Sequence, residues 1–302
     1  MKQINVAILG LGTVGGGTLD ILKNNQKEIA RRAGREIKVV SACVKDVTKK
    51  RTCDVSQIKI TDQPETIIND PNVDILIEVM GGIDPAYALV KQAIKRGKHV
   101  VTANKALIAL HGDDLFSFAN KENVRIGFEA SVAGGIPIIK AIREGLSANN
   151  IQWIAGIING TGNFILTQMQ SKASSFQEAL EEAQSRGYAE ADPTLDINGV
   201  DAAHKLTIMA SSAYGIPLNF EAVYCEGIEK VATDDIEYAE QLGYRIKHLG
   251  IAKNTTEGIE LRVHPALVPQ RRLLANVDGV MNAVVVSSDA AGPTLFYGAG
   301  AG

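Results

Sequence analysis

The residues best suited to chemistry in this 302-residue sequence are a lysine and the carboxylates near it. Asp201 and Lys205 are four residues apart in a stretch of helical composition, so their side chains share one helix face. Such a pair on its own is most often a surface ion pair worth roughly a few tenths of a kcal/mol. Here Glu190, Asp192 and Asp196 shortly precede the pair, and carboxylates grouped with one lysine can bind an ammonium group and transfer a proton. The segment is therefore a candidate site for substrate binding and acid–base chemistry.

A glycine-rich segment near the N-terminus has the spacing of a nucleotide-binding turn. The segment Gly10-Leu11-Gly12-Thr13-Val14-Gly15 follows a continuous apolar run, residues 4–9, and precedes a stretch of helical composition. In this context the first glycine permits a tight turn, the second lets the backbone approach a pyrophosphate, and the third allows the helix to pack closely on the strand. The helix N-terminus then faces the phosphates. The segment predicts a dinucleotide site, and the alternative is a glycine-rich turn that binds no ligand.

The residues after the second predicted strand bear on which dinucleotide is bound. An NAD site usually has an Asp or Glu at this point, about 20 residues after the glycine motif, which binds a ribose hydroxyl. Here the strand ends before Lys45 and Asp46, and Lys49, Lys50 and Arg51 follow. Lys45 and the basic cluster suit the 2′-phosphate of NADP, whereas Asp46 can accept a hydrogen bond from a ribose hydroxyl. We expect NADP, with NAD as a second option, and a solvated charged loop is the alternative.

A second lysine follows a later predicted strand. The segment Thr102-Ala103-Asn104-Lys105 comes immediately after a short apolar run. Loops at the carboxyl ends of strands line the ligand crevice of open α/β sheets, so Lys105 can reach a cofactor or a substrate. On position alone, a surface lysine without a role is an equal alternative.

Small residues and glycines are concentrated at residues 129–137, Glu-Ala-Ser-Val-Ala-Gly-Gly-Ile-Pro. Such a segment lets main-chain carbonyl groups converge on a hard monovalent cation, or it forms a hinge between domains. From the residues alone, the hinge is favoured.

The composition argues against several classes of protein. The chain has 31 Lys and Arg against 34 Asp and Glu, so its net charge of −3 offers no overall basic field for nucleic acid. Its longest apolar runs fall far below the roughly 20 residues that span a bilayer, and no signal peptide follows the first methionine. The five histidines lack zinc-site spacing, and the three cysteines lack the motif of a thioester-forming aldehyde dehydrogenase. We expect a cytoplasmic protein with a small-molecule substrate and with neither a nucleic-acid nor a membrane partner.

The order of predicted elements indicates an α/β fold with two domains. Strands are expected near residues 4–9, 37–44, 73–79, 100–101 and 124–128, with helices over 14–33 and 85–96. This alternation predicts βαβ units and a Rossmann-type parallel sheet in a dinucleotide-binding domain over residues 1–130. Helices are then expected at 138–146, 163–170, 176–186 and 199–214, with strands at 151–158 and around 249, 261 and 284. These form a second, α+β domain over residues 131–302.

Six motifs occur together along the chain, and they are specific as a set. They are the glycine-rich segment 10–15 and the segments 101–105 (Val-Thr-Ala-Asn-Lys), 129–137, 159–165 (Asn-Gly-Thr-Gly-Asn-Phe-Ile), 190–193 (Glu-Ala-Asp-Pro) and 198–205 (Asn-Gly-Val-Asp-Ala-Ala-His-Lys). In this combination the sequence closely resembles the homoserine dehydrogenase family, from about residue 4 to its end. The resemblance implies reversible reduction of L-aspartate 4-semialdehyde to L-homoserine with NAD(P)H, in threonine, methionine and isoleucine biosynthesis. The alternatives are another NADP-dependent dehydrogenase of amino-acid pathways and a non-catalytic NADP-binding regulator of the same fold.

The resemblance also implies roles for individual residues. Lys205 matches the proton donor in aldehyde reduction, and Lys105 matches a second active-site lysine that contacts the cofactor. Substrate contacts are implied for Glu190, Asp201 and Asp196. The expected cofactor contacts include the residues of the glycine turn and Lys45 discussed above. The full set is Gly10, Gly12, Thr13, Val14, Gly15, Lys45, Gly81, Thr102, Lys105, Gly187, Glu190 and Gly302. A monovalent cation, sodium, is implied at Glu129, Val132, Gly134 and Ile136, mostly through main-chain oxygens, and this strengthens the cation interpretation of the segment without excluding the hinge.

The resemblance further implies a homodimer or a dimer-based oligomer, joined through a sheet of the second domain, which is then both a substrate-binding and a dimerisation domain. Chains of the family continue beyond the glycine run that here ends at Gly302, into a helix and often a regulatory ACT domain. We therefore expect this sequence to be part of a longer chain.

Overall fold

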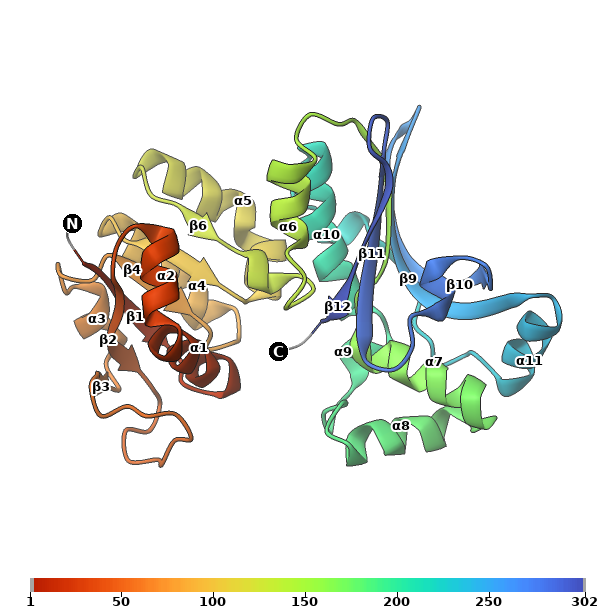
Figure 1. The fold of residues 1–302 in the computed structure, drawn as a ribbon, viewed down its shortest axis with the longest axis horizontal. Helices are drawn as coiled ribbons and strands as arrows, with labels where there is room; N and C mark the ends of the chain where they lie inside the picture. Colours follow the sequence, from red (N-terminus) through yellow and green to blue (C-terminus); the bar gives the residue numbers. More distant parts are fainter. Residues whose placement is uncertain (1–2, 301–302) are drawn as a thin grey trace. The chain divides into compact units, whose positions relative to one another are not determined.

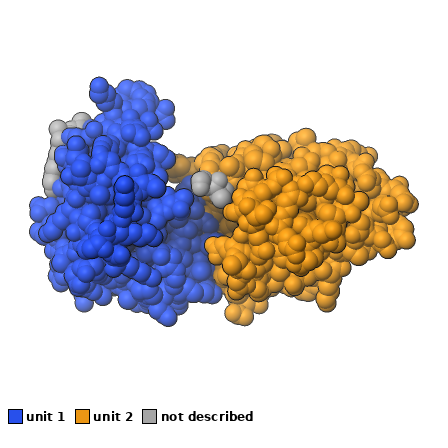
Figure 2. Space-filling model, turned by 90° about the horizontal axis from the view of Figure 1, so that it is seen from below, with its two compact units in different colours: residues 1–131 blue, residues 132–302 orange. Residues whose placement is uncertain are grey.

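The computed structural model describes residues 3–300, which form two compact units. Unit 1 ends at Ser131 and unit 2 begins at Val132 (Figure 2). Each unit has its own six-stranded sheet and its own hydrophobic cores. No helix in this part of the chain is long and apolar enough to cross a membrane.

Unit 1 is built on a sheet in which all neighbouring strands are parallel. The strands are β1 Ile4–Leu9, β2 Ile37–Cys43, β3 Lys59–Thr61, β4 Ile75–Glu78, β5 His99–Thr102 and β6 Ile126–Gly127. Their spatial order is β3-β2-β1-β4-β5-β6, so the chain leaves β1 toward one edge and later returns to β4 to fill the other (Figure 1). Ligands of such sheets bind beyond the carboxyl ends of the strands at this reversal. The predicted Rossmann-type parallel sheet is confirmed.

Helices cover both faces of this sheet. They are α1 Thr13–Asn24, α2 Gln26–Ala33, α3 Pro64–Ile68, α4 Asp84–Lys95 and α5 Lys105–Lys121, followed by a 3-10 turn η1 at Glu129–Ser131. Successive side chains of a strand point to opposite faces, and β1 supplies both cores for this reason. Val6 and Ile8 pack with Leu19 of α1, whereas Ala7 and Leu9 belong to the core that residues of α4 and α5 complete.

The helix expected over residues 14–33 is in fact two helices. Asn25, with φ −102° and ψ 16°, separates α1 from α2, and its N–H donates to the Ile21 carbonyl at 3.0 Å. Neither proline nor glycine marks this break, so composition alone did not reveal it. The expected stop of the second helix is confirmed at Gly34, which has the left-handed conformation with φ 68°.

Unit 2 is built on a sheet of order β12-β11-β7-β9-β10-β8, in which the pairs are antiparallel except β10 with β8. The strands are β7 Ile151–Ile157, β8 Tyr224–Cys225, β9 Tyr244–Thr255, β10 Gly258–Pro269, β11 Met281–Ser288 and β12 Gly292–Ala299. The four strands predicted around residues 154, 249, 261 and 284 are confirmed as β7, β9, β10 and β11. The edge strand β12 was not predicted, because its glycines and proline hide the strand pattern.

The helices of unit 2 include those predicted at 138–146, 163–170, 176–186 and 199–214, the first of them partly as a π-helix. They are α6 Ile138–Lys140, the π-helix η2 Ala141–Gly145, α7 Gly160–Lys172, α8 Phe176–Ser185, α9 Thr194–Ile197, α10 Val200–Tyr214, η3 Phe220–Ala222, α11 Thr233–Gln241 and η4 Leu273–Asn276. The capping box predicted at the start of α8 is present, since Ser175 and Glu178 bond reciprocally. Helices α7 and α8 lie side by side, and α10 packs on β9 and β10 (Figure 1). The carboxyl end of β7 and the first turns of α7 and α10 position the candidate site.

Candidate active-site residues in the two units

The turn between β1 and α1 requires two of its three motif glycines for its own geometry. Gly10 has φ +99°, and a Cβ there would lie 2.8 Å from the Val79 carbonyl oxygen. A Cβ on Gly15 would lie only 1.9 Å from the Gly10 carbonyl oxygen. These positions therefore let the helix lie directly against the end of the strand, as the sequence motif predicts.

Gly12, by contrast, is not required by the packing of the protein itself. It has φ −79° and ψ −157°, a conformation open to any residue, and a Cβ there would meet no described atom within 4 Å. Gly12, Thr13 and Val14 are all exposed, no described side chain caps the helix, and its first turn has no acidic residue. The exposed N–H groups at the N-terminus of α1 thus suit the phosphates of a dinucleotide. The absence of a side chain at residue 12 lets the phosphates approach them.

In the charged loop after β2, the exposed carboxylate of Asp46 accepts hydrogen bonds from its own loop. The Asp46 side chain accepts hydrogen bonds from the Thr48 N–H at 2.8 Å and the Thr48 hydroxyl at 2.7 Å. These bonds to Thr48 hold the pKa of Asp46 below its ordinary value. Arg51 donates to the main-chain oxygens of Asp46 at 2.5 Å and Lys49 at 2.7 Å, and Lys45 is exposed. One oxygen of the Asp46 carboxylate is therefore used within its own loop, and the loop also exposes Lys45, Lys49 and Lys50.

A buried carboxylate links the exits of β4 and β5. Glu78 has no exposed surface. Its carboxylate accepts hydrogen bonds from the Thr102 hydroxyl at 2.6 Å and from the Met80 N–H at 3.0 Å. The Thr102 oxygen in turn accepts from the Asn104 N–H at 2.9 Å, and Asn104 donates to the Gly82 carbonyl at 2.6 Å. This network fixes the loop that contains Gly81 relative to Lys105, the first residue of α5. Sequence reasoning singled out Thr102 and Lys105 but missed Glu78, which lay within an apolar run.

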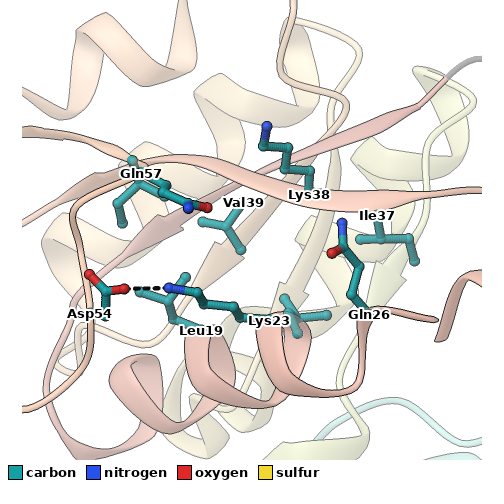
Figure 3. A pocket seen from close by; sticks show the side chains of 10 residues that line it. Leu19, Lys23, Gln26, Ile37, Lys38, Val39, Asp54 and Gln57 are labelled. Atoms are coloured by element: carbon teal, nitrogen blue, oxygen red, sulfur yellow. Dashed lines mark hydrogen bonds and ion pairs between the residues drawn. The ribbon is translucent and has the colours of Figure 1, made fainter. Parts of the chain in front are cut away.

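A shallow hollow in unit 1 lies elsewhere. It is lined by α1, the start of β2 and the loop before β3, with the Lys23–Asp54 ion pair at its rim (Figure 3). Ile37 and Val39, in its wall, belong to the amino-terminal half of β2, and Lys23 belongs to the last turn of α1. The hollow is therefore at the opposite end of the sheet from the glycine turn and is not the nucleotide site.

In unit 2, a group of polar side chains meets where β7 ends and α7 begins. Lys205 donates to the Asp201 carboxylate at 2.8 Å and to the Ile158 carbonyl oxygen at 2.7 Å. Asn159 donates to Asp196 at 2.7 Å and to Asp201 at 2.8 Å. The structure thus brings together three of the predicted residues, Asp196, Asp201 and Lys205, and adds one that sequence reasoning did not assign.

This group is largely shielded from water. The side chains of Lys205 and Asp201 are 14% and 7% exposed, so the i,i+4 pair is not the surface ion pair that its spacing alone favours. Asp201 lies in the first turn of α10, where the helix dipole favours a negative charge. Burial raises the pKa of Asp196, with the nearby Asp201 charge adding to the effect and the Asn159 hydrogen bond opposing it. The group can hold a cation and exchange a proton with it.

The loop after α8 carries two further predicted residues, Gly187 and Glu190, both exposed. Gly187 is left-handed with φ +73°, which ends the helix. The next residue, Tyr188, accepts a hydrogen bond at its carbonyl from the Thr161 hydroxyl at 2.8 Å. The loop is thereby attached to the first turn of α7, beside the acidic group.

One buried amide near this turn lacks a partner. Asn282 on β11 is 1% exposed, and neither its side-chain oxygen nor its nitrogen has a hydrogen-bond partner among the described residues. Its oxygen lies near Gly160, where a Cβ would be 3.7 Å away. No sequence motif marked this residue.

The segment predicted to bind a cation forms a tight turn. Ala133 and Gly134 both have positive φ, of 55° and 47°, and the Ile136 N–H donates to the Ala133 carbonyl at 2.9 Å. Glu129 lies in η1 of unit 1, and Val132, Gly134 and Ile136 lie in unit 2. Among residues 3–300, no group of His, Cys, Asp or Glu side chains is arranged to hold a metal ion, so any site here depends on main-chain oxygens. The predicted cofactor contact at Gly302 lies outside the described residues.

Both units match the two parts of one known enzyme family. A family model described as "Homoserine dehydrogenase, NAD binding domain" matches residues 10–129, and one described as "Homoserine dehydrogenase" matches residues 137–302. The chain belongs to the homoserine dehydrogenase family. It is therefore an NAD(P)-dependent oxidoreductase, and the predicted resemblance is confirmed.

Individual relatives match the whole chain. A homoserine dehydrogenase of Pseudomonas aeruginosa is 58% identical over 302 residues, which are 100% of this chain and 69% of that protein. The crystal structure of a homoserine dehydrogenase from Thiobacillus denitrificans is 59% identical with a TM-score of 0.98, covering 100% of this chain and 70% of that one. A hyperthermophilic archaeal homoserine dehydrogenase in complex with NADPH is 29% identical with a TM-score of 0.83, covering 100% of this chain and 93% of that one.

Proposed function

We propose that the chain interconverts L-homoserine and L-aspartate 4-semialdehyde in threonine, methionine and isoleucine biosynthesis, with unit 1 binding NADP(H) and unit 2 binding the amino-acid substrate. The observation that carries this proposal is the buried group of Lys205, Asp201 and Asp196, a proton-transferring cation held among carboxylates. When bound, the nicotinamide cofactor accepts or supplies the hydride at C4 of the substrate.

The two hydrogen bonds of Lys205 determine where it can act. An ammonium group has three N–H bonds in tetrahedral directions, and two are directed at Asp201 and the Ile158 carbonyl. The remaining direction is left for the substrate oxygen. In aldehyde reduction the third N–H donates its proton to the developing alkoxide. In homoserine oxidation the neutral amine keeps the same two N–H bonds, and its lone pair points along the third direction to accept the hydroxyl proton.

The carboxylates suit the substrate ammonium group. Asp201 compensates the charge of Lys205, which leaves Asp196 and Glu190 as the acceptors for a second cation. Of these two, Asp196 is the more buried, and burial disfavours its ionised form. A bound ammonium group would stabilise that form. Glu190 is exposed on the loop that Tyr188 ties to α7, and we propose that it contacts both the substrate and the nicotinamide end of the cofactor.

We propose NADP as the preferred cofactor. The hydrogen bonds from Thr48 use one oxygen of the Asp46 carboxylate, which weakens this side chain as an acceptor for the ribose hydroxyl of NAD. Lys45 and the basic residues after it then present positive charge to a 2′-phosphate. We propose Gly10, Gly12, Thr13, Val14 and Gly15 as the pyrophosphate contacts, Gly81, Thr102 and Lys105 as contacts at the β4 and β5 exits, and Gly187, Glu190 and Gly302 as contacts nearer the nicotinamide.

Three further features remain proposals that follow from family membership. Main-chain oxygens of the turn at Val132, Gly134 and Ile136, with Glu129, hold a sodium ion; the positive φ angles at Ala133 and Gly134 support a turn whose carbonyl groups converge. The enzyme is a homodimer or a dimer-based oligomer joined through unit 2. It acts in the cytoplasm.

The test is a spectrophotometric assay of NADPH formation. L-Homoserine with NADP is compared with a panel of other 2-hydroxy and 3-hydroxy acids, and the active pair is repeated with NAD. We expect homoserine to be the one acid of this panel that is turned over. Its kcat/KM should be higher with NADP than with NAD. Turnover with a different hydroxy acid would identify another dehydrogenase, and NADPH binding without turnover of any substrate would identify a non-catalytic regulator.

A further inference from the structure

Asn159 occupies the junction of β7 and α7, at the centre of the acidic group. It is 6% exposed, and its side-chain oxygen accepts from the Gly162 N–H at 2.7 Å, which caps α7. Its amide nitrogen donates one proton to Asp196 and the other to Asp201, at 2.7 and 2.8 Å. Both protons and the oxygen of the amide are therefore used.

This arrangement has only one orientation. Turning the amide over would place its oxygen against two carboxylates, which repel it, and its nitrogen against the Gly162 N–H. The two carboxylates come from separate elements, α9 and α10, and repel each other when both are ionised. A single NH₂ group between them supplies each with a donor and holds them side by side. The carbonyl just before Asn159, that of Ile158, accepts from Lys205, so the backbone at the same point also fixes the lysine.

We propose that Asn159 is a positioning residue for homoserine oxidation: its amide holds the Asp196 and Asp201 carboxylates in the arrangement that orients Lys205 and receives the substrate ammonium. This inference rests on the roles proposed above for Lys205, Asp201 and Asp196. Asn159 itself touches neither the reacting atoms nor the substrate in this scheme.

The chemistry of asparagine distinguishes it from other good helix caps at this position. Aspartate and serine both retain an oxygen that can accept from the Gly162 N–H, so the start of α7 is kept. An aspartate in place of Asn159 would lack both donors and add a third carboxylate to the group. Serine is shorter and has one donor, so it cannot serve two carboxylates at once. The variants Asn159→Asp and Asn159→Ser therefore keep the helix cap but lose the pair of hydrogen bonds from residue 159 to the two carboxylates.

The experiment measures homoserine oxidation at saturating NADP from pH 7 to 10 for the parent enzyme and both variants. For Asn159→Ser we expect kcat/KM for homoserine to fall by about 10- to 100-fold, as reacting groups lose their alignment. The dissociation constant of NADPH, from its fluorescence, should stay within about twofold of the parent value, because unit 1 is unchanged. For Asn159→Asp we expect the alkaline rise in rate to move up by about one pH unit or more, since a further negative charge favours protonated lysine.

Asn163 provides a matched control in the same helix. It is 1% exposed, and its amide donates to the main-chain oxygens of Val277 at 3.0 Å and Gly279 at 2.9 Å rather than to the carboxylates of Asp196 and Asp201. Asn163→Ser should lower the melting temperature but leave the alkaline rise in rate at the same pH. The titratable residues on the elements packed against α10 are the same in all of these variants: Lys140, Arg143, Glu144, Asp196, Glu221, Tyr244, Arg245, Lys247, His248, Lys253, Glu260, Arg262 and His264.

The outcomes are distinct. Parent-like kcat/KM in Asn159→Ser, or an unmoved alkaline rise in Asn159→Asp, would overturn the proposal. The same pH shift in Asn163→Ser would also overturn it, because the effect would then follow from any lost buried amide. If Lys205→Ala is inactive while both Asn159 variants behave like the parent, only this inference fails; if Lys205→Ala keeps full activity, the proposed function of the site fails with it.

Discussion

Replacing Gly12 by alanine should separate ligand binding from folding in the glycine turn. A Cβ at this position meets no described atom within 4 Å, and the backbone conformation suits alanine. Gly12→Ala should therefore fold normally and gain up to about 1 kcal/mol, because alanine restricts the unfolded chain. The same methyl group would occupy the space through which a phosphate approaches α1. We expect NADPH to bind at least about tenfold more weakly, a loss of about 1.4 kcal/mol.

Gly15→Ala is the matched variant in the same turn, and it should behave in the opposite way. Its Cβ would lie 1.9 Å from the Gly10 carbonyl oxygen, so α1 and the end of β1 would have to separate by about 1.5 Å to reach ordinary contact. Such overpacking costs about 1–3 kcal/mol. At about 4 °C for each kcal/mol, the melting temperature of unit 1 should fall by about 4–12 °C.

Thermal unfolding and a fluorescence titration with NADPH measure both quantities for both variants. Gly12→Ala should keep the parent melting temperature or raise it by up to about 4 °C, and it should bind NADPH more weakly. Gly15→Ala should melt at a lower temperature than the parent. Parent-like NADPH affinity in Gly12→Ala would refute the argument that phosphate approach, rather than packing, requires glycine there. Parent-like stability in Gly15→Ala would refute the packing argument.

Three further substitutions test separate parts of the structure. Lys45→Ala should raise KM for NADPH by about tenfold with little change for NADH, since the proposed charge-assisted contact with the 2′-phosphate is lost. Steady-state kinetics with both cofactors checks this, and equal changes in the two KM values would contradict it. Burial raises the pKa of Asp196 in the folded enzyme, so its ionisation costs stability as pH rises through that value. Asp196→Asn should consequently be more stable than the parent at pH 8 but not at pH 4, and a gain independent of pH in thermal unfolding would oppose this. Lys247 is 1% exposed and donates hydrogen bonds to the Val277 carbonyl at 2.7 Å and to the Asp278 carboxylate at 3.0 Å. Lys247→Ala should therefore lower the free energy of unfolding, measured by urea titration, by about 2–4 kcal/mol. A loss below about 1 kcal/mol would indicate that these bonds contribute little.

The features predicted from the sequence are those that neighbouring residues encode. The glycine turn, the parallel strands around it and the capping box of α8 each depend on a pattern within a few residues, and all are present. The pairing of Asp201 with Lys205 was predicted for the same reason, because one helical turn separates them. Its burial was not predicted, because burial depends on elements distant in the chain.

The features missed depend on contacts between distant residues. Asn159 meets carboxylates 37 and 42 residues away, and Glu78 bonds to Thr102 across two strands. No pattern of neighbouring residues in the sequence indicates such long-range hydrogen bonds. The interpretation of Asp46 was open for a related reason: its type suits a ribose hydroxyl, and only the structure shows that Thr48 donates two hydrogen bonds to one of its carboxylate oxygens.

The most direct test of the proposed chemistry is the rate of homoserine oxidation against pH, with both substrates saturating, for the parent enzyme and for Lys205→Ala. The group that accepts the hydroxyl proton acts in its deprotonated form, so the parent rate should rise from pH 7 to 10. Removal of the proton-transferring group should lower kcat by about 10²- to 10⁴-fold and abolish this rise. A parent rate that stays flat over this range would contradict general-base catalysis by Lys205, and full activity of Lys205→Ala would remove it from the mechanism.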